Sequence, residues 1–278
     1  MASGRTNDEI ALYVAQTITE LEEYLHHLTK NGDPDDARAD KISQWVESWT
    51  KYLKQEKKFN PRSIPAFKRG SIVYVDLGFN VGTEYGGIHY AIVLNKKDSR
   101  NNTLLHILPL TSIKKTTDVD NLKYYQLSLS NEIHRLLIQK AQSNIKLIAE
   151  KKIIFEEKQE KIDQKIAELK SILKDQVVSE DLNPRFEEYF ENELSIVTSE
   201  QQEIDKIVRD MTAQSEYLEK LINKIKNLKM GSIALLNQVT TISKLRLLDP
   251  INKKSLLTDI TLSAETLDII DDALKNIL

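Results

Sequence analysis

The stretch "KRGSIVYVDLGFNVGTEYGGIHYAIVLN", residues 68–95, decides the fold of this 278-residue chain. Its β-branched and apolar residues alternate over 72–77 and return at 89–94, which predicts two strands. Five of the eight glycines of the chain lie between Gly70 and Gly87, and His89 follows at once. Glycine permits positive φ and close approach of the backbone to a ligand. Glycine crowding by itself favours a tight, irregular hairpin loop between the strands, with a ligand-contacting loop as the alternative.

Further strand signals lie on both sides of a long interruption. The run "TLLHILPL" follows the first two strands, and "SIALLN" and "QVTTIS" come only after residue 230. A last helix is expected to begin at the capping residue Ser263. Residues 67–130 and 230–278 together comprise about 110 residues, a sensible size for one small β-barrel-like domain. The sequence thus predicts a barrel that is split along the chain and joined in space.

The interruption itself has the pattern of two long helices. Residues 131–229 contain almost no glycine or proline, and a break at "VVSEDLNPRF" offers Ser179 and Asp181 as caps and Pro184 as a helix start. Two arms of about 45 residues would each be roughly 65 to 70 Å long. We predict an inserted antiparallel coiled-coil hairpin, against the alternative of two helices from a larger bundle. Apolar residues at alternating spacings of three and four define its core: Ile138, Ala141, Ile145, Ile148, Phe155, Ile162, Ile166, Leu169, Leu173, Phe190, Leu194, Val197, Ile204, Val208, Met211, Leu218, Ile222 and Ile225.

Residues 1–66 predict a separate helical extension. Apolar residues recur at helical spacing from residue 8 to residue 58, and "NGDPDDARAD" in the middle indicates a turn and a new helix start. We expect Trp45, Trp49 and Tyr52 to seat these helices on the barrel or on the base of the hairpin. The predicted fold class is α+β.

Composition excludes several classes of site. The chain has no cysteine, so disulfides, thiolate zinc sites and cysteine nucleophiles are excluded. His26 and His27 are adjacent on a helix and point about 100 degrees apart, which does not suit a paired metal ligand set. No phosphate-binding glycine loop with Lys-Ser/Thr and no serine nucleophile elbow is present. We expect no metal and no cofactor, and a soluble, cytoplasmic protein without a membrane segment.

The strand segments resemble those of a known family. "KRGSIVYVDLGFNVGTEYGGIHYAIVLN", "ILPLTSIKK" and "GSIALLNQVTTISKLRL" look like the PemK/MazF toxins of toxin–antitoxin systems, in the same order. The resemblance implies a small SH3-like barrel, usually dimeric, that cleaves single-stranded RNA without a metal ion and is neutralised by an antitoxin protein. It covers the split domain only. A homodimer through the barrel is therefore expected unless the helical arm replaces or blocks that surface.

One residue departs from the family pattern. The family usually has Gly-x-Arg-Pro after the loop, with an arginine that contacts the scissile phosphate, and the matching residues here are Gly87, Ile88, His89 and Tyr90. An imidazole takes and gives a proton near neutral pH, as RNA cleavage by the 2′-hydroxyl requires. Thr111 matches the family's active-site threonine, and its hydroxyl would donate to a phosphate oxygen. We expect His89 and Thr111 to be catalytic, with loss of the site as the alternative for His89.

The resemblance also suggests a substrate-binding set around these two residues. The loop would approach RNA through its backbone, its tyrosine would stack on a base, and the basic residues after the third strand would attract phosphates. The set comprises Gly86, Gly87, Glu84, Tyr85, Ser112, Lys114 and Lys115. We expect His106 to be a face or core residue of its strand and Gln238 to have a structural role.

Two functions follow as hypotheses. The first is a metal-independent endoribonuclease toxin with single-stranded RNA as substrate and an antitoxin as partner. The second is a catalytically inactive binding or regulatory protein of the same fold that docks a protein partner with its coiled-coil arm. Residues 131–229 carry 17 Lys plus Arg and 20 Asp plus Glu, so the arm offers no basic track for RNA.

Overall fold

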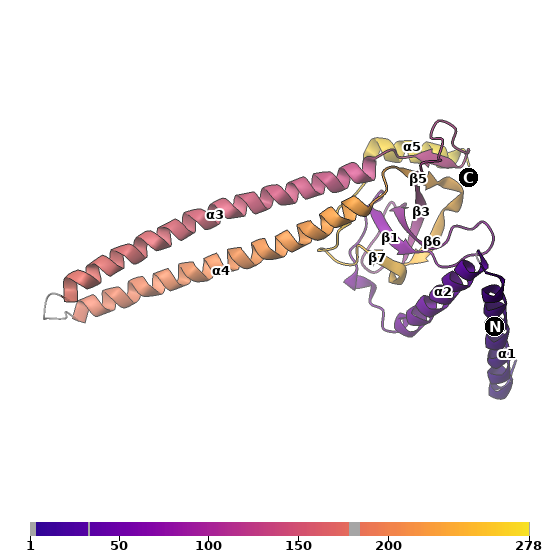
Figure 1. Ribbon diagram of the computed structural model, residues 1–278, viewed down its shortest axis with the longest axis horizontal. Coiled ribbons are helices and arrows are strands. Elements are labelled where there is room, and N and C mark those ends of the chain that lie inside the picture. Colours follow the sequence, from indigo (N-terminus) through magenta and orange to yellow (C-terminus); the bar gives the residue numbers. More distant parts are fainter. Residues whose placement is uncertain (1–3, 33, 178–183, 278) are drawn as a thin grey trace. The chain divides into compact units, whose positions relative to one another are not determined.

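The computed structural model describes residues 4–32, 34–177 and 184–277, and it confirms the α+β class (Figure 1). The chain divides into two compact units. One comprises residues 1–111, 123–127 and 234–278, and the other comprises residues 112–122 and 128–233. The first is called here the sheet unit and the second the long-helix unit.

An antiparallel sheet forms the centre of the sheet unit. Its strands follow the order β4-β5-β3-β2-β1-β7, with β6 also paired to β3; the bounds are β1 (Ile72–Asp76), β2 (Ile88–Val93), β3 (Leu104–Ser112), β4 (Gln126–Ser128), β5 (Ser232–Leu235), β6 (Thr240–Ser243) and β7 (Leu247–Asp249). Pairing of β1 with β7 and of β3 with β6 therefore joins strands that are far apart in the sequence. Closure of this sheet into an SH3-like barrel stays a prediction, as do the domain boundaries.

The core of the sheet unit is built from the alternating side chains that predicted the strands. Val73 and Val75 of β1 are completely buried, as are Ala91 and Val93 of β2. The apolar partners from later segments are Leu105, Ile107, Ile242 and Leu247. The helix α5 (Ala264–Lys275) begins after Ser263, whose hydroxyl accepts a hydrogen bond from the backbone N–H of Thr266, so the predicted cap is confirmed.

Two helices precede the sheet. The helix α1 (Asn7–Asn31) begins with a capping box between Thr6 and Glu9, and α2 (Asp35–Glu56) follows after a short turn. Leu28, Ala39 and Ile42 form a small core between them. Trp45 packs against Gly78, just after β1, and Tyr52 donates to Asp76 at the end of β1, whereas Trp49 is half exposed.

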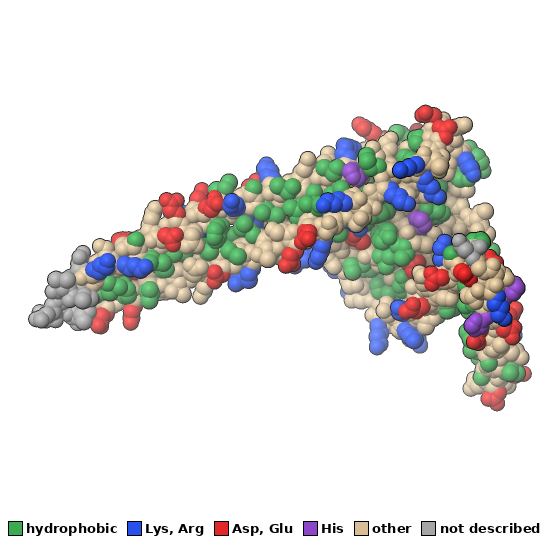
Figure 2. Space-filling model, in the orientation of Figure 1, with side chains coloured by type: hydrophobic (Ala, Val, Ile, Leu, Met, Phe, Trp, Pro, Cys, Tyr) green, Lys and Arg blue, Asp and Glu red, His purple; other side chains and the backbone are tan. Residues whose placement is uncertain are grey.

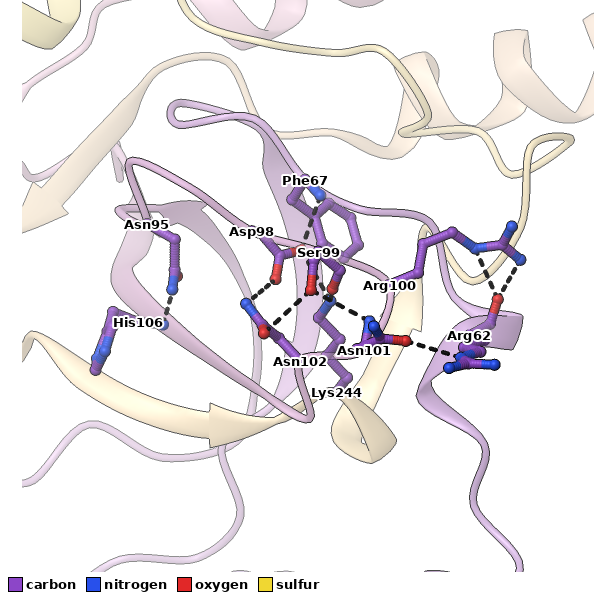
Figure 3. Close-up of polar contacts among 10 residues, drawn as sticks. All are labelled: Arg62, Phe67, Asn95, Asp98, Ser99, Arg100, Asn101, Asn102, His106 and Lys244. Carbon is purple, nitrogen blue, oxygen red and sulfur yellow. Dashed lines mark hydrogen bonds and ion pairs between the residues drawn. The ribbon is translucent and has the colours of Figure 1, made fainter.

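A buried ion pair fixes the loop between β2 and β3 (Figure 3). The side chains of Lys244 and Asp98 are fully buried and lie 2.8 Å apart. The ammonium of Lys244 also donates to the carbonyl of Ser99 and lies 5.6 Å from the centre of the Phe67 ring. Asp98 accepts two more hydrogen bonds, from the backbone N–H of Phe67 and the side chain of Asn102. The pair therefore ties this loop to a segment of the chain that is more than a hundred residues away.

The long-helix unit contains α3 (Glu132–Val177) and α4 (Pro184–Asn227) packed against each other. Ion pairs join Lys151 to Asp210, Lys158 to Glu203 and Lys165 to Glu193, in descending order on α4, so the helices are antiparallel. Figure 2 shows basic and acidic side chains mixed along both helices. Whether their packing is that of a coiled coil stays a prediction.

The predicted apolar stripe is buried only in part. Ile162, Leu169, Val197 and Ile204 form the core between the long helices. Ile145, Leu194 and Val208 of the same stripe are 51%, 50% and 43% exposed. By contrast, Leu221, the chain neighbour of the stripe residue Ile222, was not included in the predicted stripe and is completely buried. The expected caps Ser179 and Asp181 lie outside the described residues. No helix in the described part of the chain is both long enough and apolar enough to span a membrane.

Candidate active site

The glycine-rich loop between β1 and β2 is closed at its base by backbone hydrogen bonds. The N–H of Gly87 donates to the carbonyl of Gly78 at 2.6 Å, and the N–H of Leu77 donates to the carbonyl of Gly87 at 2.8 Å. A Cβ atom on Gly86 would lie 2.6 Å from the carbonyl oxygen of Gly78, closer than real Cβ contacts come. This close approach explains why the loop needs glycine at its base.

Side-chain amides hold the middle of the loop. The backbone N–H of Tyr85 donates to the side chain of Gln238 at 3.0 Å, and the side chain of Asn80 donates to the carbonyl of Tyr85 at 2.9 Å. Gln238 also donates to the carbonyl of Thr83 at 3.4 Å. The loop is thus attached to the segment between β5 and β6, which agrees with the structural role expected for Gln238.

His89 lies near the start of β2, directly beside this loop. Its Nδ1 atom is 3.0 Å from the hydroxyl of Tyr85, and the two rings pack with centroids 4.3 Å apart. The same hydroxyl donates to the carbonyl of Leu110 on β3 at 3.3 Å. Tyr85 therefore orients the imidazole and connects it to the neighbouring strand, a position that the sequence did not suggest.

Thr111 lies at the end of β3, next to His89. The β2–β3 ladder ends with Ala91 opposite Pro109, and the same register continued by two residues brings Thr111 opposite His89, on the same face. Burial raises the pKa of Tyr85, and a hydrogen bond with the Thr111 side chain counteracts that rise. The Tyr85 hydroxyl thus contacts both residues that were predicted to be catalytic.

The surroundings of His89 favour its neutral form. Burial lowers the pKa of the imidazole below its ordinary value of 6.5, and a hydrogen bond with the backbone of Gly86 opposes that shift. Near neutral pH the ring is therefore largely unprotonated, which is the state that accepts a proton. An imidazole in this state beside a hydroxyl donor suits removal of a proton from a nucleophile and hydrogen bonding to a developing negative charge.

A cavity of about 580 Å³ opens beside His89. The loop supplies one wall, and the helix α2 supplies the other. The volume falls within the range of about 300 to 1,000 Å³ that is typical of small-molecule sites. The loop and strand residues that line it are Asp76, Gly78, Phe79, Asn80, Gly82, Glu84, Gly86, Gly87, Ile88 and His89, and the residues from α2 are Arg38, Lys41, Gln44, Trp45 and Ser48.

The predicted substrate-binding residues fall into two groups. Gly86, Gly87 and Glu84 line the cavity together with His89, and the ring of Tyr85 is packed against the imidazole. The second group, Ser112, Lys114 and Lys115, belongs to the long-helix unit, where both lysines are exposed. His106 is exposed on β3, and its Nδ1 atom lies 2.8 Å from the Thr241 hydroxyl, as expected for a face residue.

Sequence reasoning missed a polar group at the root of the loop. Asp76 is buried at the end of β1, where its carboxylate accepts hydrogen bonds from the Tyr52 hydroxyl at 3.0 Å and the Gly78 N–H at 2.9 Å. Burial and the Asp76 charge raise the pKa of Tyr52 to about 12. The guanidinium of Arg246 donates to the backbone carbonyl of Asp76 at 2.8 Å, and burial lowers the pKa of Arg246. An acidic residue at the end of a buried strand was the available signal.

No group of three or more His, Asp or Glu side chains is arranged to hold a metal ion within the described ranges. Around His89, the loop and strand residues that the sequence singled out offer the imidazole itself, the hydroxyls of Tyr85 and Thr111, and the carboxylate of Glu84. The chemistry that this set supports by itself is proton transfer and hydrogen bonding.

Comparison with known proteins gave one family match. Residues 68–179 match the model for the PemK-like, MazF-like toxin of type II toxin-antitoxin systems. The match includes β1 to β4, the glycine-rich loop, His89 and Thr111, and it confirms the resemblance found in the sequence. Residues 230–278 lie outside it, so their resemblance to the family stays a prediction. No curated protein matches the chain.

Proposed function

We propose that this chain, whose residues 68–179 match the model for the PemK-like, MazF-like toxins, is an endoribonuclease toxin that cleaves single-stranded RNA. The observation that carries the proposal is the position of Tyr85, whose hydroxyl contacts both the imidazole of His89 and the strand end at Thr111. The family match supports the class of activity, and this geometry supports the assignment of the site.

His89 acts as the general base in the proposed reaction. The neutral imidazole takes the proton from a ribose 2′-hydroxyl, and the 2′-oxygen attacks the adjacent phosphorus. The bond from phosphorus to the 5′-oxygen breaks, and that oxygen takes a proton from the imidazolium. The products are a 2′,3′-cyclic phosphate and a 5′-hydroxyl. Atoms and charge balance without a further reactant.

Thr111 stabilises the charge that develops during this attack. Its hydroxyl would donate to a non-bridging phosphate oxygen as negative charge builds there. Removal of a single preorganised donor of this kind commonly costs about 100-fold to 1,000-fold in kcat. Gly86 and Gly87 would allow the sugar–phosphate backbone to approach the loop, because no side chain stands in the way. Ser112, Lys114 and Lys115 are proposed to contact flanking phosphates.

The experiment is cleavage of a labelled single-stranded RNA by the purified full chain in the presence of EDTA. We expect cleavage with a 2′,3′-cyclic phosphate product, and a loss of at least about 100-fold in His89→Ala and in Thr111→Ala. His106→Ala is the matched control, because this histidine is exposed on β3 and does not line the cavity. Cleavage that survives both site variants would remove the proposed site.

The second function remains the alternative outcome of the same experiment. The observation that favours it is His89 itself, which stands where the family usually has a phosphate-contacting arginine. RNA left intact at high protein concentration, with specific retention of a protein partner by the full chain, would support a binding or regulatory role.

An antitoxin is the proposed protein partner of the toxin. It would cover the glycine-rich loop and the cavity, which are accessible through the exposed residues Gly87 and Glu84. Neutralisation of RNA cleavage by the product of an adjacent small open reading frame would test this. A homodimer is likewise proposed from the family, and sedimentation of the full chain measures it.

A further inference from the structure

One face of α2 lines the same cavity as His89. Arg38, Lys41, Trp45 and Ser48 follow one another at spacings of three, four and three residues, so they project from the same side of the helix. This helix lies in the N-terminal extension, which is outside the family match. The cavity is therefore completed by a part of the chain that the toxin family model does not include.

Three contacts seat α2 against the root of the loop. The Trp45 ring fills the space beside Gly78, where a Cβ atom would lie 2.7 Å from it. The guanidinium of Arg246 lies over this indole, 5.0 Å from the ring centre. The hydroxyl of Tyr52, two turns later, donates to Asp76. The helix is thus fixed next to the site by polar and aromatic contacts rather than loosely appended.

The charges that α2 brings to the cavity are two cations. The guanidinium of Arg38 lies 5.1 Å from the centre of the Phe79 ring of the loop, and its Nε atom is 3.4 Å from the Tyr24 hydroxyl. Within the described residues, no carboxylate lies within ion-pair distance of Arg38 or Lys41. Both side chains are exposed toward solvent at the cavity. They are therefore available to an anionic ligand.

The acidic residues of the cavity do not cancel these two charges. The carboxylate of Asp76 is buried and already accepts hydrogen bonds from Tyr52 and Gly78, and Arg246 lies against its backbone carbonyl. Glu84 is the remaining carboxylate of the lining, and it projects from the loop on the opposite wall. The α2 wall is cationic, and the loop wall carries His89.

We propose that Arg38 and Lys41 each bind a phosphate of the single-stranded RNA backbone, next to the phosphate at His89. This inference rests on the proposed function. It assigns the N-terminal helices a part in substrate binding, and it supplies from α2 the positive charge that the motif lacks at position 89. A guanidinium with its fork of donors and an ammonium are the two side chains suited to phosphate.

The salt dependence of RNA binding tests the proposal. Binding of a labelled single-stranded RNA is measured with His89→Ala as parent, so that the RNA stays intact, from 0.1 M to 1 M salt. Each phosphate contact adds about 0.7 to the slope of log K against log salt for single strands. We expect Arg38→Ala/Lys41→Ala to lower the slope by about 1.4, which corresponds to a roughly 25-fold greater loss of affinity at 0.1 M than at 1 M.

A matched control removes the same charge from the same helix. Lys51 and Lys54 have the same spacing as Arg38 and Lys41 and do not line the cavity. Lys51→Ala/Lys54→Ala should leave the slope within about 0.3 of the parent, and Arg38→Lys/Lys41→Arg should restore it. Unchanged circular dichroism shows that α2 is intact in each variant.

The outcomes separate this inference from the proposed function. An unchanged slope in Arg38→Ala/Lys41→Ala, with RNA cleavage by the wild type, overturns the inference and leaves the function. A wild type that does not cleave RNA, with a slope that depends on Arg38 and Lys41, overturns the function and leaves the phosphate site. Equal effects of the two double variants overturn the inference, because they indicate general attraction by positive charge.

Discussion

Asp98→Ala is expected to destabilise the sheet unit strongly. The carboxylate accepts hydrogen bonds from Lys244 at 2.8 Å, from the Phe67 N–H at 2.9 Å and from Asn102 at 3.0 Å. Its removal leaves a fully buried ammonium with the Ser99 carbonyl and the Phe67 ring as its remaining contacts. Breaking a buried ion pair from one side costs about 3 to 5 kcal/mol. With a urea slope of about 2 kcal/mol per molar, the midpoint should fall by roughly 1.5 to 2.5 M.

Tryptophan fluorescence measures this loss of stability in the sheet unit itself. The chain has two tryptophans, Trp45 and Trp49, and both lie in α2 within the sheet unit. Urea unfolding followed by fluorescence therefore reports the unit that contains Lys244 and Asp98. Asp272→Ala is the control, because this residue forms an ion pair of 2.9 Å with Lys275 that is about three-quarters exposed. We expect its midpoint to equal that of the wild type, since exposed pairs contribute little.

A double-mutant cycle decides whether the buried charge is the cause. Lys244→Met removes the ammonium and keeps much of the side-chain volume. Asp98→Ala/Lys244→Met should then be more stable than Asp98→Ala alone, because no uncompensated charge remains. Additive losses in the double variant, or a midpoint shift below about 0.5 M for Asp98→Ala, would refute the reasoning.

Three further predictions concern the site. Because burial lowers the pKa of His89, the acid limb of kcat/KM for RNA cleavage should have its midpoint below pH 6.5. Protonation of His89 also favours the unfolded chain, in which its pKa is higher. The stability that depends on the neutral ring is therefore complete above about pH 6.5 and is lost as the pH falls through the folded-state pKa. A midpoint above pH 6.5, or an acid limb unchanged in an active His89 variant, contradicts this assignment. Tyr85→Phe keeps the ring but removes the hydroxyl at Nδ1, so kcat should fall about 10-fold with KM unchanged in steady-state assays; a loss confined to KM argues against positioning. Gly86→Ala places a Cβ atom 2.6 Å from the Gly78 carbonyl oxygen and should lower the free energy of unfolding by about 1 to 3 kcal/mol in urea titrations. Gly82→Ala is the control, because its Cβ atom meets no atom within 4 Å and the variant tests the effect of positive φ alone. Equal losses of unfolding free energy in the two variants would contradict the close approach at Gly86.

Local pattern was enough to predict the helices and most strands. Alternation around Val73 and Val75 and the cap at Ser263 are properties of a few consecutive residues, and the structure contains the corresponding elements. The stripe on the long helices was less reliable, because Ile145 is exposed and Leu221 is buried. Apolar residues on adjacent faces of a helix satisfy the same spacing, and only the partner helix decides which of them is covered.

The candidate site depended on both levels. The motif around Gly87 and the threonine after the third strand identified His89 and Thr111 from the sequence, through their resemblance to a family. Tyr85 was predicted from the sequence as a substrate-binding residue, but its contact with His89 follows from the path of the loop. Arg38 and Asp76 were not found, because their contacts with Phe79 and Tyr52 form only when α2 packs on the sheet unit.

The α-helices, most of the strands, the glycine-rich loop and the resemblance of the strand segments to the toxin family could be recognised from the sequence, because these depend on residues close together in the chain. Tertiary structure decided three matters: the pairing of β1 with β7 and β3 with β6, the burial of Lys244 with Asp98, and the second wall of the cavity from α2. Each brings together residues from distant segments, and no local spacing encodes which distant partner a strand edge, a buried charge or a helix face will meet.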